Sequence, residues 1–280
     1  MSTTRVDPTN EDQARAWDGP EGAFWATHHH QLEAVLGHYQ PAFAEACAIG
    51  PDDDVLDVGC GTGETSRAAA AVAVRGTVTG LDLSSAMVRV GRSLAVAHGL
   101  TNVRLLCADA QVHPFVPESH DVVMSRTGAM FFGRPRQAFT NIARAMRPGA
   151  RLALLTWQPP ARNAWFSAFT QALLGAVPTP SSEAPGPFSM SDRAVVEDLL
   201  DGSGFRDVHI AGLTGPVTYG RDPDHAYALL IGLLGWMLET RAPDDRAAAA
   251  EALRTTLGLH HGSRGVQFDS ATWLVTATRA

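Results

Sequence analysis

Lysine is absent from this sequence, so all 22 cationic residues are arginine, against 29 acidic residues. The formal net charge is −7 at pH 7, and charged residues make up only 18% of the chain. Proteins that grip the phosphates of DNA or RNA usually carry a basic face. The charge balance therefore disfavours nucleic acid as a partner or a substrate.

Cysteine is scarce and long apolar runs are missing. Cys47, Cys60 and Cys107 are widely spaced and form no CxxC pair, which favours reduced thiols and no zinc site of the usual spacing. No apolar run approaches the 18 residues of a membrane helix, and residues 1–12 lack the apolar core of a signal peptide. We expect a cytoplasmic protein with no membrane-inserted segment and no bound metal.

Short apolar runs alternate with helical stretches along the chain. This alternation predicts an α/β fold with a mostly parallel sheet and helices on both faces. The predicted strands, seven in all, cover residues 55–58, 77–83, 102–107, 121–124, 151–156, 207–211 and 272–278.

Helical patterns flank this core on both sides. Apolar residues recur at helical spacing from Leu32 to Phe43, where Pro41 should kink or break the helix, and residues 222–258 read as largely helical and apolar. We therefore expect an N-terminal helical lid over residues 1–48 and a ligand-binding core over 49–157. Residues 158–280 would supply the rest of the sheet with an inserted helical cap.

The most informative segment is VLDVGCGTGE at residues 55–64, a buried strand followed by three glycines and a helix. Glycine lets the backbone turn tightly and lets a ligand approach closely. Dinucleotide sites use G-x-G-x-x-G, whereas this turn has G-x-G-x-G and is preceded by Asp57. The acid would repel a pyrophosphate but can accept hydrogen bonds from an ammonium group, which disfavours a nicotinamide oxidoreductase.

Two more acids stand at the ends of the next predicted strands. Asp82 ends the second strand, where a carboxylate can hold both hydroxyls of a ribose. Asp109 ends the third, where it can accept from an adenine amino group or simply cap a helix. A ligand with an ammonium group, a ribose and an adenine matches all three acids, and S-adenosylmethionine has that shape.

Five segments, VLDVGCGTGE, GLDLS, ADAQ, DVVMSRTGAMFF and ARAMRPGARLALLTW, resemble the successive motifs of the class I, Rossmann-like S-adenosylmethionine-dependent methyltransferases. The small-molecule enzymes of quinone biosynthesis are among the most similar. The resemblance covers about residues 50–157 and implies a seven-stranded Rossmann-like sheet with S-adenosylmethionine as cofactor. Ala150 replaces the second glycine of the usual RPGG, which affects only a turn.

The resemblance also implies a set of cofactor-binding residues. The glycine turn and Asp57 would surround the methionine part, Asp82 would bind the ribose, and Asp109 would meet the adenine. The full set is Asp57, Gly59, Cys60, Gly61, Gly63, Asp82, Leu83, Met87, Asp109, Ala110 and Ser125.

Candidate acceptor residues follow from location, since ligands of such sheets sit outside the C-terminal strand ends. They are Trp17, Arg126, Trp157, Asn163 and Trp165. Trp25 would either make a cation–π contact with the sulfonium or pack a lid onto the body. His28, His29 and His30 fan around a helix, so no metal site is expected from them. His28, one turn from Trp25, is our candidate general base, although a base is needed only for a protonated nucleophile.

The sequence thus predicts a methyltransferase acting on a small, largely apolar acceptor through an undetermined O, N or C atom. A secondary-metabolite or quinone-like acceptor fits the resemblance. The alternative is an S-adenosylmethionine-binding protein with a cyclase-like, lyase-like or sensing role, because a fold does not fix a function. A monomer and a homodimer both remain open, since residues 229–238 would suit a core or a dimer seam.

Overall fold

The computed structural model describes residues 5–181 and 184–280. Its sheet has the order β3-β2-β1-β4-β5-β8-β6, with the short β7 paired to β8 beside this path. Neighbours among β1 to β5 pair in parallel, and β8 runs antiparallel to both β5 and β6. The strands are β1 Val55–Val58, β2 Val78–Asp82, β3 Val103–Cys107, β4 His120–Arg126, β5 Met146–Trp157, β6 Phe205–Gly220, β7 His261–Gly262 and β8 Gly265–Arg279.

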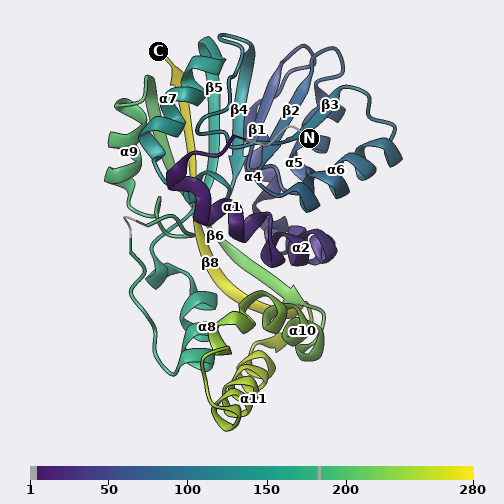
Figure 1. Cartoon of the computed structure of the whole chain (residues 1–280), viewed down its shortest axis with the longest axis vertical. Coiled ribbons are helices and arrows are strands. Elements are labelled where there is room, and N and C mark those ends of the chain that lie inside the picture. Colours follow the sequence, from purple (N-terminus) through teal and green to yellow (C-terminus); the bar gives the residue numbers. More distant parts are fainter. Residues whose placement is uncertain (1–4, 182–183) are drawn as a thin grey trace.

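Helices cover the sheet, cross its C-terminal edge and build a cap beyond it (Figure 1). The N-terminal helices are α1 Glu11–Trp17, α2 Pro20–Thr27, α3 His29–Val35 and α4 Gln40–Cys47. The helices of the core are α5 Glu64–Val72, α6 Ser85–Ala97, α7 Pro135–Ala145 and α9 Arg193–Asp201. Helices α8 Ala164–Leu174, α10 Pro223–Leu234 and α11 Pro243–Leu259 form the cap. The predicted α/β fold is confirmed.

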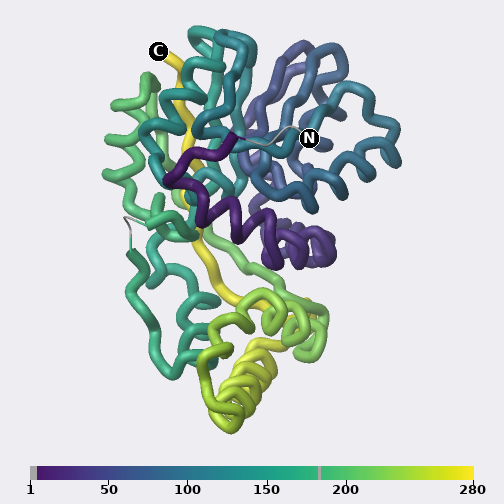
Figure 2. Tube along the Cα trace, in the orientation of Figure 1, coloured from purple at the N-terminus to yellow at the C-terminus, as the bar shows by residue number. Residues whose placement is uncertain are grey.

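The last two strands of the sheet are far longer than the sequence predicts. Gly212, Gly215 and Pro216 interrupt the apolar pattern of β6, so the pattern alone favours a strand of only five residues. In the structure all three pair with β8, opposite Trp273, Ser270 and Asp269. Proline is tolerated there because β6 is an edge strand. Strands β6 and β8 therefore run out of the core and carry the cap (Figure 2).

Prolines begin helices in both helical stretches that flank the core, and the break predicted near Pro41 is confirmed. The predicted helix around residues 32–43 is split into α3, a 3₁₀ turn at Gly37–Tyr39 and α4, with Pro41 in the first turn of α4. Likewise, the apolar stretch over residues 222–258 is split by η5 Gly235–Leu238, and α11 begins at Pro243. Proline fits a first helical turn because that position needs no N–H donor.

Apolar burial concentrates between the sheet and its helices. In the described residues no helix combines the length and the apolar character needed to cross a membrane. Leu229 and Leu230 of α10 are fully buried inside the chain, whereas Trp236 in η5 is 62% exposed. Leu229, Leu230 and Leu238 of this stretch therefore belong to the core, and the oligomeric state stays a prediction. The predicted division into an N-terminal lid, a ligand-binding core and a C-terminal region with the cap stays a prediction, because β6 and β8 belong to both the sheet and the cap.

Phe139 tests this packing, because its side chain is fully buried and its ring contacts Phe132 and Phe205 edge-on. Phe139→Ala should lower the free energy of unfolding by about 3–5 kcal/mol, the usual cost of such a cavity. Urea unfolding measures it. The matched change Val96→Ala, at a residue 78% exposed, should stay within about 0.5 kcal/mol of the parent. Equal losses in the two variants would contradict this core.

Candidate functional site

A cavity of about 440 Å³ opens where the C-terminal ends of β1, β2 and β4 meet the N-terminal helices and the cap. Cavities of this size are typical of small-molecule sites. Many of the predicted site residues line it, namely Trp17, Trp25, Gly59, Cys60, Gly61, Asp82, Leu83, Met87, Asp109, Ala110, Arg126, Trp157 and Trp165.

The glycine turn after β1 forms one wall of this cavity. Gly59, Gly61 and Gly63 all have positive φ angles, of 71°, 56° and 75°, which side chains other than glycine rarely adopt. At Gly59 a Cβ atom would also lie 2.7 Å from the Cα atom of Gly128, on the loop after β4. The turn is therefore held in a shape that exposes its backbone to a ligand.

Asp82 faces the same cavity from the end of β2. Its Oδ2 accepts from the Gly61 amide at 2.8 Å, and its Oδ1 accepts from the Ser84 amide at 2.9 Å. Each oxygen keeps a second lone pair for a ligand donor. Burial raises the pKa of Asp82 to about 6, against the hydrogen bonds that lower it. Ser84 caps helix α6, so Asp82 is not needed as the cap.

Three predicted cofactor residues, Asp57, Gly63 and Ser125, are not among the residues that line the cavity. Asp57 is fully buried, and its Oδ2 accepts from Thr65 and Ser66 at 2.7 and 2.6 Å. Gly63 caps α5, and the Ser125 hydroxyl donates to the carbonyl oxygen of Val58 at 2.7 Å. These residues hold the turn in place. The Oδ1 atom of Asp57 is buried without a hydrogen-bond partner, and burial raises the pKa of this carboxyl.

Asp109 lines the cavity but is already engaged by the N-terminal segment. Its Oδ2 accepts from the Asp7 amide, and its Oδ1 accepts from the Asn10 side chain and the Gln111 amide, each at 2.9 Å. Asn10 also accepts from the Gly133 amide at 2.6 Å. Asp109 therefore fastens the first helices across the site, a role that the sequence pattern does not reveal.

The end of β5 and the cap helix α8 supply an aromatic wall on the other side of the cavity. Trp157 and Trp165 lie with ring centres 5.1 Å apart, and Phe166 and Phe169 continue the wall. The predicted acceptor residue Asn163 is buried and does not line the cavity. Its side-chain nitrogen donates to the backbone carbonyl oxygen of Gln158. Its side-chain oxygen, Oδ1, accepts from the Ala271 amide and from the ring nitrogen of Trp165. It positions Trp165, so our prediction of a contact residue needs correction.

The N-terminal helices close the cavity with two tryptophans. Trp17 and Trp25 pack edge-on at 5.7 Å, and Trp17 packs in the same way on Phe131 at 5.2 Å. Trp25 thus packs the lid, and its Nε1 is buried with no hydrogen-bond partner. Arg126 lines the cavity between Gln40 and Glu64, which both accept from its guanidinium.

His28 does not reach this cavity, and the structure corrects that prediction. Its ring stacks on Phe24 at 4.1 Å, and its Nδ1 lies 3.0 Å from the Phe24 carbonyl oxygen. The prediction assumed one helix through Trp25 and His28, but α2 ends at Thr27 and α3 begins at His29. His29 and Glu33 line the cavity instead. The spacing of His29, Leu32 and Leu36, one helix face, is the signal that sequence reasoning missed.

Residues 55–149 match the protein-family model described as "Methyltransferase domain". This part of the chain is similar to a methyltransferase domain. The match confirms the predicted family and fold class. The domain covers the glycine turn, Asp82 and Asp109 but not the N-terminal helices or the cap.

Curated relatives agree over the same region. An uncharacterized protein of Mycobacterium tuberculosis (strain ATCC 25618 / H37Rv) is 33% identical over 152 residues, 54% of each chain. The ubiquinone/menaquinone biosynthesis C-methyltransferase UbiE of Stutzerimonas stutzeri is 28% identical over 176 residues, 58% of this chain and 69% of that one. The chain spans about half the length of the mycobacterial relatives that it matches.

Solved structures share the fold at low sequence identity. The YcgJ protein of Bacillus subtilis has a TM-score of 0.56 at 18% identity, covering 90% of this chain and 99% of that one. The [4+2]-cyclase SpnF has the same TM-score and identity, covering 100% of this chain and 99% of its own. These likenesses concern the fold alone.

The residues of the cavity fit S-adenosylmethionine, the cofactor of this domain family. The exposed glycine backbone suits the amino-acid part, and the Asp82 carboxylate has lone pairs free for ribose hydroxyls. Leu83 and Met87 stand beside Asp82, where a flat adenine ring would find apolar contacts. The chemistry of the donor set therefore agrees with the family match.

The Asp109 contacts predict a measurable loosening of the lid. Asp109→Ala removes the acceptor of the Asp7, Asn10 and Gln111 bonds, each worth about 1.5 kcal/mol or more when the acceptor is charged. Amide hydrogen exchange over residues 5–17, followed by mass spectrometry, should become at least tenfold faster. Asp52→Ala, at an exposed surface pair with Arg75, is the control and should leave this exchange unchanged. An unchanged rate in Asp109→Ala would refute the fastening role.

The raised pKa of Asp82 predicts a pH-dependent affinity for the cofactor product. The carboxyl becomes protonated as the pH falls through about 6, and a protonated carboxyl accepts hydrogen bonds less well. Affinity for S-adenosylhomocysteine, measured by calorimetry, should fall about tenfold from pH 8 to pH 5. Asp82→Asn should bind more weakly at pH 8 and lose most of this dependence. A dependence that is unchanged in Asp82→Asn would point to another group.

Proposed function

We propose that this chain transfers a methyl group from S-adenosylmethionine to a small, largely apolar acceptor. The observation that carries the proposal is the continuity of one cavity. The glycine turn and Asp82 line one side of it, and the aromatic residues of the cap line the other. A cofactor on the turn and an acceptor against the opposite wall would meet inside the same cavity.

The chain's own residues would bind, orient and exclude water. Gly59 to Gly61 and Asp82 would hold the cofactor, which supplies a methyl group made electrophilic by its sulfonium. Trp17 and Trp25 would keep water out from the N-terminal side. Holding two reactants in line and close together supplies much of the acceleration in such a reaction.

The acceptor class follows from the aromatic wall. Trp157, Trp165, Phe166 and Phe169 offer flat faces and few polar atoms, and Leu233 and Leu234 of α10 extend this surface. Such a wall favours a planar, mainly apolar molecule. A secondary-metabolite or quinone-like acceptor, a cytoplasmic location and the absence of a nucleic-acid partner belong to the same proposal and rest on the sequence arguments.

A non-methylating role is the second candidate, since one structure with the same fold is a [4+2]-cyclase. In that case the protein would bind S-adenosylmethionine without consuming it. Release of S-adenosylhomocysteine in the presence of an acceptor separates the two functions, because only methyl transfer produces it.

Calorimetric titration with S-adenosylmethionine, S-adenosylhomocysteine and NAD tests the proposal first. The first two should bind and NAD should not. Asp82→Ala should weaken S-adenosylmethionine binding about 100-fold, since two hydrogen bonds to a charged group are lost. Asp52→Ala, on the surface, should bind like the parent. Binding that ignores the Asp82 change, or a preference for NAD, would refute the proposed site.

Trp165→Ala separates acceptor recognition from cofactor recognition. The variant should bind S-adenosylmethionine like the parent, because Trp165 belongs to the cap wall. With planar aromatic acceptors, the rate at which S-adenosylhomocysteine is released should fall at least tenfold. The loss should come mainly from a higher KM for the acceptor, because aromatic contacts and buried area are lost. A loss of cofactor affinity of the same size would contradict the division of the cavity.

A further inference from the structure

A histidine and a glutamate of helix α3 stand together at the cavity. His29 and Glu33 both line it, one helical turn apart. The Nδ1 atom of His29 lies 3.6 Å from the Oε2 atom of Glu33 and is buried with no hydrogen-bond partner of its own. The carboxylate is therefore the group that Nδ1 faces, and Nε2 is the nitrogen left for a ligand.

Glu33 is held in this position from the glycine turn. Its Oε1 accepts from the hydroxyl of Thr62 at 2.6 Å, and the guanidinium of Arg67 lies 3.8 Å away. Thr62 directly follows Gly61, whose backbone borders the cavity. The carboxylate that orients His29 is thus tied to the same turn that would hold the cofactor.

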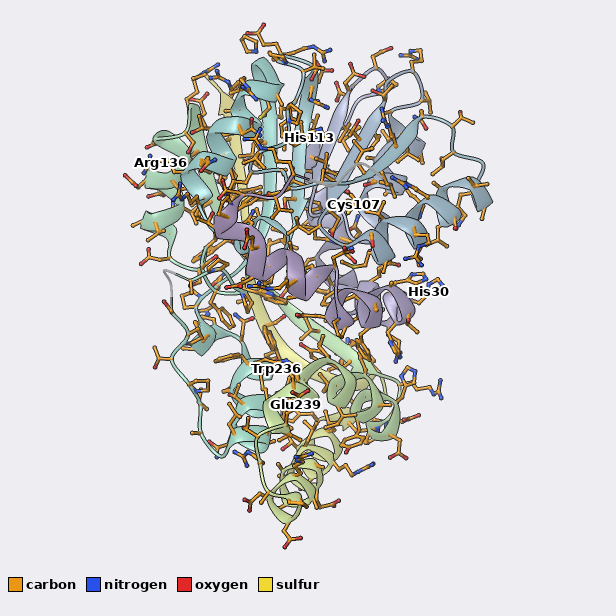
Figure 3. All side chains as sticks on the ribbon, in the orientation of Figure 1. His30, Cys107, His113, Arg136, Trp236 and Glu239 are labelled. Carbon is orange, nitrogen blue, oxygen red and sulfur yellow. The ribbon has the colours of Figure 1, made fainter. Side chains whose placement is uncertain are left out.

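The neighbouring histidines do not share this environment. His30 is exposed, at the outer end of the N-terminal helices (Figure 3), although its ring centre lies 4.0 Å from that of His29. His28 packs on Phe24 outside the cavity. The side chains of His29 and Glu33 are only 12% and 16% exposed. Their shielding strengthens an electrostatic contact that water would weaken at the surface.

Three other polar groups on the cavity wall, Tyr219, Cys60 and Glu64, are less suited to take a proton. Burial raises the pKa of Tyr219 and of Cys60, so both keep their protons near neutral pH. Glu64 is paired with Arg126. A neutral imidazole with one nitrogen oriented by a carboxylate is the usual arrangement of a general base.

We propose that His29 is the general base of this site, that Glu33 positions it, and that the acceptor is activated by loss of an O–H or N–H proton. This inference rests on the proposed methyl transfer. The proton of the acceptor moves to Nε2 of His29. The electron pair that it leaves behind forms the bond to the methyl carbon, while the pair of the broken C–S bond stays on sulfur.

Glu33 acts through the orientation of His29. It favours the tautomer with the proton on Nδ1, which leaves the lone pair of Nε2 toward the acceptor. It also stabilises the imidazolium that forms after proton transfer. The titratable and charged groups beside His29 and Glu33 are His30 on α3 and Arg67 on α5, and Arg67 balances part of the Glu33 charge.

The tautomer of His29 gives the first test, and it needs no acceptor. In protein labelled with ¹⁵N at histidine, with S-adenosylhomocysteine added, the ring signals of His29 should show a protonated Nδ1 and a bare Nε2. His30→Ala should leave this pattern unchanged, whereas Glu33→Gln should produce a mixture of tautomers. The same mixture in the parent and in Glu33→Gln would overturn the positioning role.

The same spectra also test whether these residues bind a metal ion. His29, His30 and Glu33 offer ligand atoms that lie within 4.8 Å of one another, so one equivalent of ZnCl₂ is added to the sample. Unchanged His29 signals support the base. A joint shift of His29 and His30 that is lost in His30→Ala would overturn it in favour of a metal site.

Transfer rates give the second test, with 1-naphthol and 1-naphthalenethiol as probes at pH 8. The thiol is mostly ionised at this pH and needs no base, whereas the naphthol does. His29→Ala should slow transfer to naphthol by at least about 100-fold and transfer to the thiolate by less than threefold. Glu33→Gln should lower kcat for naphthol with little change in KM, and His30→Ala should match the parent. Equal losses on both probes in His29→Ala would overturn the base role.

Calorimetry keeps this proposal separate from the proposed function. His29→Ala should bind S-adenosylmethionine like the parent, so that a slow reaction reports the missing base and not a missing cofactor. If the parent itself binds no S-adenosylmethionine, the methyltransferase proposal fails. The base role then falls with it, whatever the tautomer spectra show.

Discussion

The hydrogen bond between the Gly61 amide and the Asp82 carboxylate is the contact on which the site depends. It joins the turn after β1 to the end of β2, two neighbouring parallel strands. The Gly59 and Cys60 amides also donate to the carbonyl oxygen of Leu81, so this bond completes a set of three that holds the turn against the end of β2. Behind the turn, Asp57 accepts from Thr65 and Ser66 and so holds the start of α5 against the sheet. Buried acids therefore organise this edge of the sheet before any ligand arrives.

The rest of the cavity is assembled from segments that lie far apart in the sequence. The N-terminal helices are fastened by Asp109, which is about a hundred residues away from Asp7 and Asn10. Helix α3 is connected to the glycine turn through Glu33 and Thr62. These polar contacts set the lid at the turn, while apolar packing of Trp17 on Phe131 closes the remaining gap. The lid is thus tied to the residues that a cofactor would touch.

Much of the core was predictable because its signals are local. Each of the first five strands contains a short apolar run, and the turn after β1 needs glycine for its positive φ angles. The side chains that share the cavity were harder to predict. Asp109 resembles a ligand contact in the sequence, but a distant segment supplies its partners. His28 was preferred over His29 because a helix break between them is set by tertiary packing and leaves little trace in the residue pattern. The length of strand β6 is underestimated from the sequence, because its glycines and proline interrupt the apolar pattern but still pair with β8.

The long antiparallel ribbon of β6 and β8 has a consequence for how such a protein changes over evolutionary time. Helices α10 and α11 of the cap form an excursion between two strands that are already paired inside the core, and the last pairs of this ribbon lie outside it (Figure 1). Helices inserted, lost or exchanged between Gly220 and Gly265 would alter the part of the cavity wall that includes Leu233 and Leu234, without disturbing the order of the sheet. New acceptor preferences can therefore arise by replacing one loop-like insertion, while the half of the cavity that faces the cofactor is inherited unchanged.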